Sequence, residues 1–203
     1  MHLAMALYLQ YHNAERLGWL PLDEAPFRRT HPAIFTRRSL VTQAMGGQVL
    51  VIVSLGRPRR YFLWESFQVT SVSPLAGGYF AWGPGWQLAP PQLLEGTAFE
   101  EFRRACANFV GFRSIQRLDY AASLVALAER FRERPLSASV EEFCTQLIEW
   151  LPNQGDAYFA RAQVRLGLGR TIEARNDLER ARHLGSDLAP RLSPPSHLAS
   201  LPG

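Results

Sequence analysis

The stretch AMGGQVLVIVSLGRPRRYFLWESFQVTSV, residues 44–72, contains the clearest strand signal of the chain. A glycine pair leads into residues 48–55, a continuous apolar run rich in β-branched residues. Such a run, bounded by turn signals, is typical of a buried central strand. A basic turn over 56–60 follows, and then residues 61–72, which we expect to form one long strand or two strands joined at a kink. The stretch therefore predicts the centre of a β-sheet.

Weaker signals surround this stretch in the first half of the chain. Residues 3–11 fit a first buried strand, and Asn13 after it can cap a short helical turn. Residues 73–91, which are rich in glycine, proline and aromatic residues, predict a loop. Residues 99–109 have the apolar spacing of an amphipathic helix. We therefore expect a compact, β-rich domain over residues 1–117.

After this domain, apolar residues recur with a helical period. Pro135 and Pro152 interrupt the pattern, and Gly169 marks a third break. Residues 189–203 are rich in proline and predict a flexible tail. The pattern predicts four helices, over 118–134, 140–150, 157–168 and 171–184.

The predicted helices also repeat, at a spacing of 34 residues. Leu124 then aligns with Tyr158, and Ala128 aligns with Ala162. The second unit of the repeat, GDAYFARAQVRLGLGRTIEARNDLERARHLGSD, resembles the tetratricopeptide family. The residues at the key positions of that family are Tyr158, Ala162, Gly169, Ala174, Leu178 and Ala181.

The first unit departs from the family pattern. Pro135 stands in place of the turn glycine, and Val140 stands in place of a small alanine. The resemblance implies two helical hairpins over residues 118–188. Members of this family usually bind peptides or proteins in a groove. We therefore expect these helices either to recruit a protein partner or to brace the first domain.

The first domain carries a resemblance of its own. The glycine step, apolar strand, turn and alternating strand of residues 44–72 resemble the PUA-like barrels, including the EVE and ASCH types. The resemblance implies a small mixed β-barrel that reads RNA or a modified base in a pocket lined by aromatic side chains. Together, the two resemblances imply an α+β chain, in which an N-terminal PUA-like barrel precedes an all-α pair of tetratricopeptide-like hairpins.

The charge of the chain is uneven. All 22 basic side chains are arginines, as expected for a GC-rich genome. Residues 1–117 contain 12 arginines and 7 acidic residues, whereas residues 118–203 contain 10 arginines and 11 acidic residues. The basic excess therefore belongs to the first domain, and it favours an anionic partner for that domain.

Basic turns interleaved with aromatic residues indicate nucleic-acid binding by the first domain. Guanidinium groups bind phosphates, and exposed aromatic rings stack on bases. For such a site, the arginine groups must line one cleft with at least one accessible indole. The alternatives are a solvated turn for the arginines, a core position for Trp64, and a cap or loop role for His12. The candidate nucleic-acid-binding residues are Arg37, Arg38, Arg57, Arg59, Arg60, Trp64, Trp82, Trp86, His12 and Asn13.

The sequence contains no catalytic signature such as HExxH or a phosphate-binding GxxxxGK[ST]. Cys106 and Cys144 lack CxxC spacing, so we expect neither a metal site nor a disulfide framework, and a reduced cytoplasmic setting fits. No apolar run approaches the roughly 18–20 residues that span a bilayer. We predict a non-enzymatic protein without a cofactor that binds RNA or single-stranded or modified DNA. The alternative is a protein–protein adaptor that acts through residues 118–188.

Overall fold

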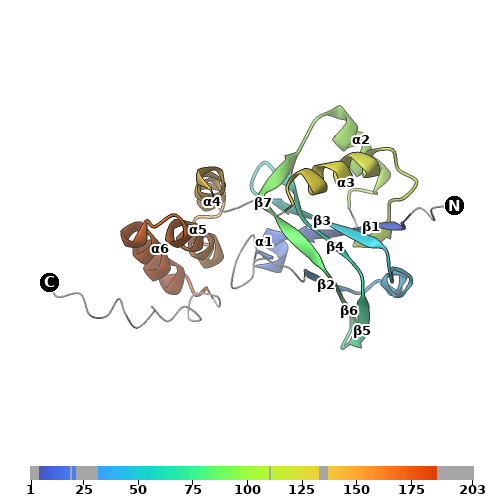
Figure 1. Ribbon diagram of the computed structural model, residues 1–203, viewed down its shortest axis with the longest axis horizontal. Helices are drawn as coiled ribbons and strands as arrows, with labels where there is room; N and C mark the ends of the chain where they lie inside the picture. Colours follow the sequence, from blue (N-terminus) through green and yellow to red (C-terminus); the bar gives the residue numbers. More distant parts are fainter. Residues whose placement is uncertain (1–4, 19, 22–31, 110, 133–136, 187–203) are drawn as a thin grey trace. The chain divides into compact units, whose positions relative to one another are not determined.

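The computed structural model describes residues 5–18, 20–21, 32–109, 111–132 and 137–186 (Figure 1). The predicted tail over 189–203 lies outside the described residues. The described chain is α+β, with eight strands in two sheets and six α-helices. It divides into two compact units. The described residues of unit 1 fall within 1–18 and 27–135, and those of unit 2 fall within 19–26 and 136–203.

Unit 1 is built on a five-stranded sheet in the order β7-β4-β3-β1-β8. β1 pairs parallel with β3, and the other neighbours pair antiparallel. Every residue of β3 is buried, which confirms the predicted central strand. The strands are β1 (Leu7–Asn13), β3 (Gln48–Leu55), β4 (Arg60–Gln68), β7 (Gly85–Leu94) and β8 (Phe112–Ser114).

A smaller sheet, in the order β2-β6-β5, contains β2 (Ala33–Thr36), β5 (Ser71–Leu75) and β6 (Gly78–Trp82). The loop predicted over 73–91 is therefore wrong, since most of that segment lies in strands. Along β6 the side chains alternate between the two faces of the sheet, as strand pairing requires. This alternation outweighs the turn signals of the glycines and prolines in the same segment.

The two sheets share one long bent hairpin. β4 runs on into β5, and β6 runs on into β7 (Figure 1). At the bend, Val69 pairs with the glycine pair of residues 46–47 through two backbone hydrogen bonds of 2.9 Å. A Cβ at Gly83 would overlap the carbonyl oxygen of Gln68, so this close approach requires glycine. Of the two alternatives expected for 61–72, the structure has the second, two strands joined at a bend. The two sheets do not close into a barrel.

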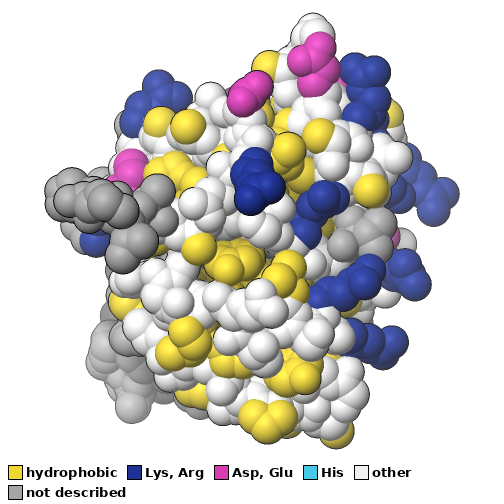
Figure 2. Space-filling model, turned by 90° about the vertical axis from the view of Figure 1, so that its right-hand side faces the viewer, with side chains coloured by type: hydrophobic (Ala, Val, Ile, Leu, Met, Phe, Trp, Pro, Cys, Tyr) yellow, Lys and Arg dark blue, Asp and Glu magenta, His cyan; other side chains and the backbone are white. Residues whose placement is uncertain are grey.

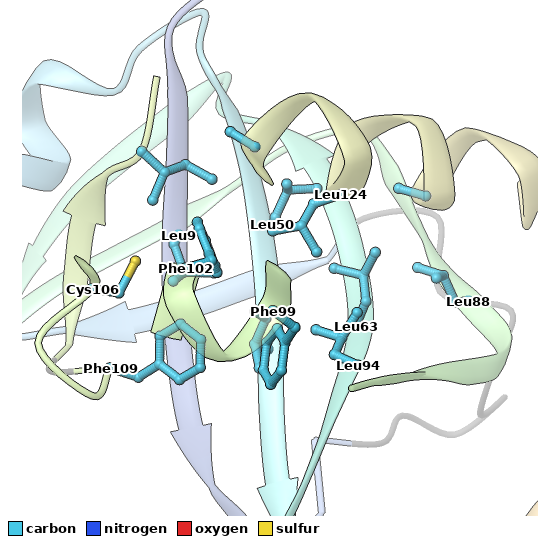
Figure 3. Packing of buried hydrophobic residues seen from close by; sticks show 14 residues of the cluster. Leu9, Leu50, Leu63, Leu88, Leu94, Phe99, Phe102, Cys106, Phe109 and Leu124 are labelled. Carbon is cyan, nitrogen blue, oxygen red and sulfur yellow. The ribbon is translucent and has the colours of Figure 1, made fainter. Parts of the chain in front are cut away.

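Two helices cover one face of the five-stranded sheet, α2 (Thr97–Ala105) and α3 (Tyr120–Arg130). They bury a continuous apolar core against the strands (Figure 3). α3 belongs to unit 1, so the boundary between the units follows α3 instead of preceding it at residue 118. The apolar stripe of α3 packs into the core between this sheet and α2. The core side chains labelled in Figure 3 are Leu9, Leu50, Leu63, Leu88, Leu94, Phe99, Phe102, Cys106, Phe109 and Leu124.

A left-handed turn ends α2. Ala107, Asn108 and Phe109 have φ angles of 47°, 54° and 60°. The turn places the Phe109 ring in the core, where its centroid lies 5.4 Å from that of Tyr11. The Asn108 side chain accepts a hydrogen bond of 2.8 Å from Arg103. Left-handed backbone costs a non-glycine residue about 1–2 kcal/mol, so this packing holds a strained turn in place.

Replacing Ala107 by glycine is expected to raise the free energy of unfolding by about 0.5–1 kcal/mol, because glycine adopts positive φ without a steric cost. The matched control is Ala126→Gly, at an exposed position within α3. There the same change is expected to lower stability by about 1 kcal/mol. Urea unfolding followed by circular dichroism checks both variants. A loss of stability in Ala107→Gly would show that the turn is not strained.

Unit 2 contains three described helices, α4 (Ala138–Trp150), α5 (Gly155–Gly167) and α6 (Thr171–His183). α5 and α6 form the main contact, and α4 packs on α5. A Cβ at Gly155 would lie 2.8 Å from the carbonyl oxygen of Ala181, so small residues allow the helices to approach closely. The last three predicted helices are confirmed. Of the four helices predicted over 118–184, the first, α3, belongs to unit 1, so unit 2 contains α4, α5 and α6 of the predicted pair of hairpins.

Buried ion pairs link the helices of unit 2. Asp177 of α6, with a side chain 5% exposed, accepts hydrogen bonds of 2.8–2.9 Å from Arg161 and Arg165 of α5. Glu141 of α4 accepts hydrogen bonds of 2.6–2.8 Å from Arg165 and Arg170. Two carboxylates from different helices therefore share three guanidinium groups. These three arginines are therefore engaged in the packing of unit 2 itself.

Candidate functional site

The small sheet of unit 1 has one buried face and one exposed face. Ile34 and Ala81 point into the molecule and are at most 1% exposed. Phe35 and Phe80 pair directly across β2 and β6 and are each 39% exposed. Trp82, two residues beyond Phe80, lies on the same side and is half-buried. We call Phe35, Phe80 and Trp82 the aromatic face.

The rings of the aromatic face form a contiguous surface. The centroids of Phe80 and Trp82 lie 5.4 Å apart, with 36° between the ring planes. Gly78 lies beneath Phe35, since a Cβ there would come within 2.9 Å of the Phe35 ring and within 2.5 Å of the Thr36 carbonyl oxygen. Glycine at this position lets Phe35 lie over the sheet. The result is a set of aromatic rings that planar ligands can stack against.

Two arginines adjoin the aromatic face. Arg37 and Arg38 directly follow β2, and both are exposed. The backbone N–H of Arg38 donates a hydrogen bond of 3.2 Å to Oγ1 of Thr36, which anchors the start of this segment. Neither guanidinium group forms an ion pair with any described residue, in contrast to Arg161, Arg165 and Arg170 of unit 2. Both charges are available to an anionic partner.

Arg57, Arg59 and Arg60 lie elsewhere. They belong to the turn between β3 and β4, where Arg60 pairs with Leu55. β2 instead reaches the far end of the bent hairpin, where Thr36 pairs with Tyr79 beside the β5–β6 turn. The two arginine groups are therefore at opposite ends of the hairpin. The expected single cleft lined by both groups is not formed.

Two of the candidate tryptophans have structural roles. Trp64 is 0% exposed, so it cannot stack on a ligand, and its assignment as a binding residue is corrected to a core position. Trp86 donates a hydrogen bond of 3.2 Å from its indole to the carbonyl oxygen of Ala128 at the end of α3. The guanidinium carbon of Arg132 lies 4.7 Å from the Trp86 ring centroid. Trp86 therefore holds α3 against the sheet. Of the three candidate tryptophans, Trp82 is the one that lies on the aromatic face.

His12 and Asn13 lie at the end of β1. The Asn13 side chain accepts a hydrogen bond of 2.9 Å from the backbone N–H of Arg16, which confirms the predicted helix cap. His12 pairs with Val53 of β3 and is half-buried. Burial lowers the pKa of His12 to about 4, so the imidazole is neutral at neutral pH.

This shift makes the stability of unit 1 depend on pH. The pKa of His12 is about 4 in the folded state against 6.5 for an ordinary histidine, so the unfolded chain binds the proton first as the pH falls. We expect stability to be lost as the pH decreases from about 6.5 toward 4. In His12→Gln this contribution should be absent. Urea unfolding at a series of pH values tests the change, and an identical pH profile in both proteins would contradict it.

Sequence reasoning missed Phe35 and Phe80. Both belong to short strands whose residues alternate between apolar core and aromatic surface. The alternation of Phe80 with Ala81 and Trp82 could have indicated a strand with an exposed aromatic side.

Figure 2 shows one face of the molecule, on which many basic side chains gather along one margin beside scattered hydrophobic groups. Acidic side chains are fewer on that face.

Among the described residues, no three His, Cys, Asp or Glu side chains come together in a way that could hold a metal ion. No helix in this part of the chain has the length and apolar character needed to cross a membrane.

Comparison with known proteins found no match to this chain among family models, curated proteins or solved structures. We therefore infer function from the geometry of the chain itself.

Proposed function

We propose that unit 1 binds single-stranded nucleic acid on the aromatic face, with Arg37 and Arg38 holding the phosphate backbone. The observation that carries the proposal is the pair Phe35 and Phe80, which are directly opposed on neighbouring strands and each 39% exposed. Aromatic side chains displayed on a β-sheet are a recurrent means of binding unstacked bases.

The physical chemistry of the face supports single strands over duplexes. Each base stacked on an aromatic side chain contributes about 1–3 kcal/mol, and only unpaired bases expose their flat faces. The adjacent guanidinium groups supply the charge that a phosphate backbone requires. Two exposed phenylalanines side by side also form an apolar patch of the kind that marks an interaction surface.

A binding titration tests the proposal. Labelled single strands of about 12 nucleotides, as oligo-uridine RNA and oligo-thymidine DNA, would be titrated with the full chain at low salt and followed by fluorescence anisotropy. We expect both to bind and a duplex of equal length to bind more weakly. Absence of binding by both single strands would reject the proposed function.

The salt dependence of binding should identify the arginines involved. For single strands, the slope of log affinity against log salt is about −0.7 for each phosphate neutralised. The double variant Arg37→Gln, Arg38→Gln is therefore expected to reduce the slope by about 1.4. The matched control is Arg57→Gln, Arg59→Gln, at the exposed turn on the other end of the hairpin. An equal reduction in the control would contradict the assignment of the phosphates to Arg37 and Arg38.

We also propose that unit 1 is PUA-like and that unit 2 is tetratricopeptide-like. A PUA-like fold of unit 1 is supported by the mixed sheet, with its parallel β1–β3 pair and its long bent hairpin. A tetratricopeptide-like character of unit 2 is supported by the α5–α6 hairpin and by buried Ala162, Ala174 and Ala181 at its helix contact.

A second candidate function is a protein–protein adaptor that acts through unit 2. The observation that favours it is the turn between α5 and α6, where Leu166, Leu168 and Ile172 are 39%, 38% and 78% exposed. Such a patch can dock an apolar partner surface. A pull-down that compares the full chain with Ile172→Asp tests this function. Equal recovery of all partners would reject the role of the patch.

A further inference from the structure

A cleft of about 400 Å³ lies between α2 and the segment that leads into α3, within unit 1. Its volume falls in the range of about 300–1,000 Å³ that is typical of small-molecule sites. The two helices lie side by side over the large sheet (Figure 1). The floor of the cleft is apolar, because Phe102 of α2 is buried there and Leu118 is half-buried. The aromatic face belongs to the other sheet, so the cleft is a separate feature of unit 1.

Three charged side chains also line the cleft, Glu101 of α2 and, just before α3, Arg117 and Asp119. All three are exposed. Within the described part of the chain, none of them forms an ion pair or a side-chain hydrogen bond. By contrast, Glu100 on the same helix pairs with Arg103. Two carboxylates and one guanidinium group around the cleft therefore remain available to a ligand.

These charges select the class of ligand. With one more carboxylate than guanidinium group, the lining favours a ligand of net positive charge and disfavours a phosphate. The guanidinium group in turn binds a carboxylate. A ligand that carries two cationic groups and one carboxylate therefore satisfies all three side chains. A free amino acid with a basic side chain has this pattern of charges.

The positions of the three side chains suit such a molecule. Arg117 and Asp119 are two residues apart in one segment, so together they can bind the carboxylate and the ammonium group that an amino acid carries on one carbon. Glu101 comes from the other wall, where it can bind the cationic end of the ligand's side chain. The apolar floor suits the methylene groups between, as apolar surfaces do for the stems of lysine and arginine. Tyr120 also lines the cleft, and its ring packs on Phe102 with 5.3 Å between the centroids.

We propose that the cleft between α2 and α3 binds a free basic amino acid such as lysine or arginine. Arg117 binds its α-carboxylate, Asp119 binds its α-ammonium group, and Glu101 binds the cationic end of its side chain. Because ion pairs at exposed positions are individually weak, we expect a dissociation constant on the order of 1 mM. The proposal stands independently of nucleic-acid binding on the aromatic face.

An NMR titration of the full chain tests the ligand class with four probes at equal ionic strength. L-lysine has all three charged groups, cadaverine lacks the carboxylate, L-norleucine lacks the side-chain ammonium group, and L-glutamate has the opposite side-chain charge. We expect L-lysine to bind at least about threefold more tightly than cadaverine or L-norleucine, and L-glutamate not to bind. Amide shifts should change in residues 98–105 and 117–123, which contain the lining of the cleft.

Two variants assign the charged groups. Glu101→Gln should weaken the binding of L-lysine and cadaverine alike, by about threefold, because both lose a counter-charge. Arg117→Gln should weaken L-lysine by a similar factor and leave cadaverine unweakened, because cadaverine has no carboxylate. The matched control is Glu95→Gln, at an exposed position outside the cleft, which should bind both ligands as the unmodified chain does.

A third variant fills the cleft without removing a charge. Ala105 is exposed and lines the cleft, so Ala105→Phe should abolish detectable binding of L-lysine. Its control is Ala126→Phe, at an exposed position of α3 outside the cleft, and circular dichroism checks that both variants fold. Neither change should alter the affinity for oligo-uridine.

The proposal is overturned if L-lysine binds no more tightly than cadaverine and L-norleucine, or if its shift changes lie outside the cleft. It is also overturned if a folded Ala105→Phe variant binds L-lysine as the unmodified chain does. Failure of the aromatic face would be recognised separately, as absence of binding to oligo-uridine. Loss of L-lysine binding in Ala105→Phe, with binding retained in Ala126→Phe, would support the site.

Discussion

Replacement of Asp177 by asparagine is expected to lower the free energy of unfolding of unit 2 by about 3 kcal/mol. The carboxylate of Asp177 forms ion pairs with both Arg161 and Arg165, and its side chain is only 5% exposed. Asparagine preserves the size of the side chain and removes its charge. Two partly buried guanidinium groups would then lack a full counter-charge, and the remaining amide would direct N–H groups toward them.

The measurement is urea unfolding followed by far-ultraviolet circular dichroism. The matched control is Glu173→Gln, because Glu173 pairs with Arg170 at 2.9 Å but has a side chain 42% exposed. Exposed pairs contribute roughly 0–1 kcal/mol, so this control should change stability little. Equal effects in the two variants would mean that burial of the Asp177 pairs does not determine their contribution.

Replacement of Phe80 by alanine is expected to weaken the binding of single strands by roughly tenfold. The loss corresponds to one stacked base, which contributes about 1–3 kcal/mol. The double variant Phe35→Ala, Phe80→Ala should weaken binding further, because the two rings are directly opposed on neighbouring strands. The control is Leu93→Ala on β7, a residue that is 45% exposed and lies outside the aromatic face.

Fluorescence anisotropy with oligo-uridine strands measures these affinities. Both phenylalanines are more than one-third exposed, so their truncation should leave the core largely intact, and circular dichroism provides the check on folding. If Leu93→Ala weakens binding as much as Phe80→Ala, the effect is not specific to the aromatic face. Unchanged affinity in the double variant would exclude stacking on these rings.

The central strand and the helices of unit 2 could be predicted from sequence because their signals are local. The run over residues 48–55 contains only two polar residues, Gln48 and Ser54, both close to its ends, and it forms β3. The periodic segments after residue 137 form α4, α5 and α6 near their predicted limits. In each case the apolar pattern has one period and clear breakers on both sides.

The position of α3 could not be predicted in the same way. Its pattern identifies an apolar stripe, in which Leu124 and Ala128 are buried, but a stripe does not specify the surface it covers. The repeat spacing assigned α3 to a helical hairpin, whereas the chain places it on the sheet of unit 1. Trp86 and Arg132 secure this docking, and their contact joins positions far apart in sequence.

The candidate site was predicted only in part for a similar reason. Arg37, Arg38 and Trp82 were named from composition, and they lie on or beside the aromatic face. Trp64 looked equivalent in the sequence but is completely buried. β4 pairs irregularly on both sides around this residue, so simple alternation does not give its direction. Which aromatic residues face solvent depended on strand pairing that the sequence alone did not reveal.

An NMR titration of the full chain with oligo-uridine tests the central claim most directly, because amide shifts report where the strand lies. We predict that the largest shift changes occur in β2, in β6 and at Arg37 and Arg38. The turn over residues 56–60 and the helices α4 to α6 should change little. Shift changes concentrated on that turn or on unit 2, with none on β2 and β6, would contradict the account.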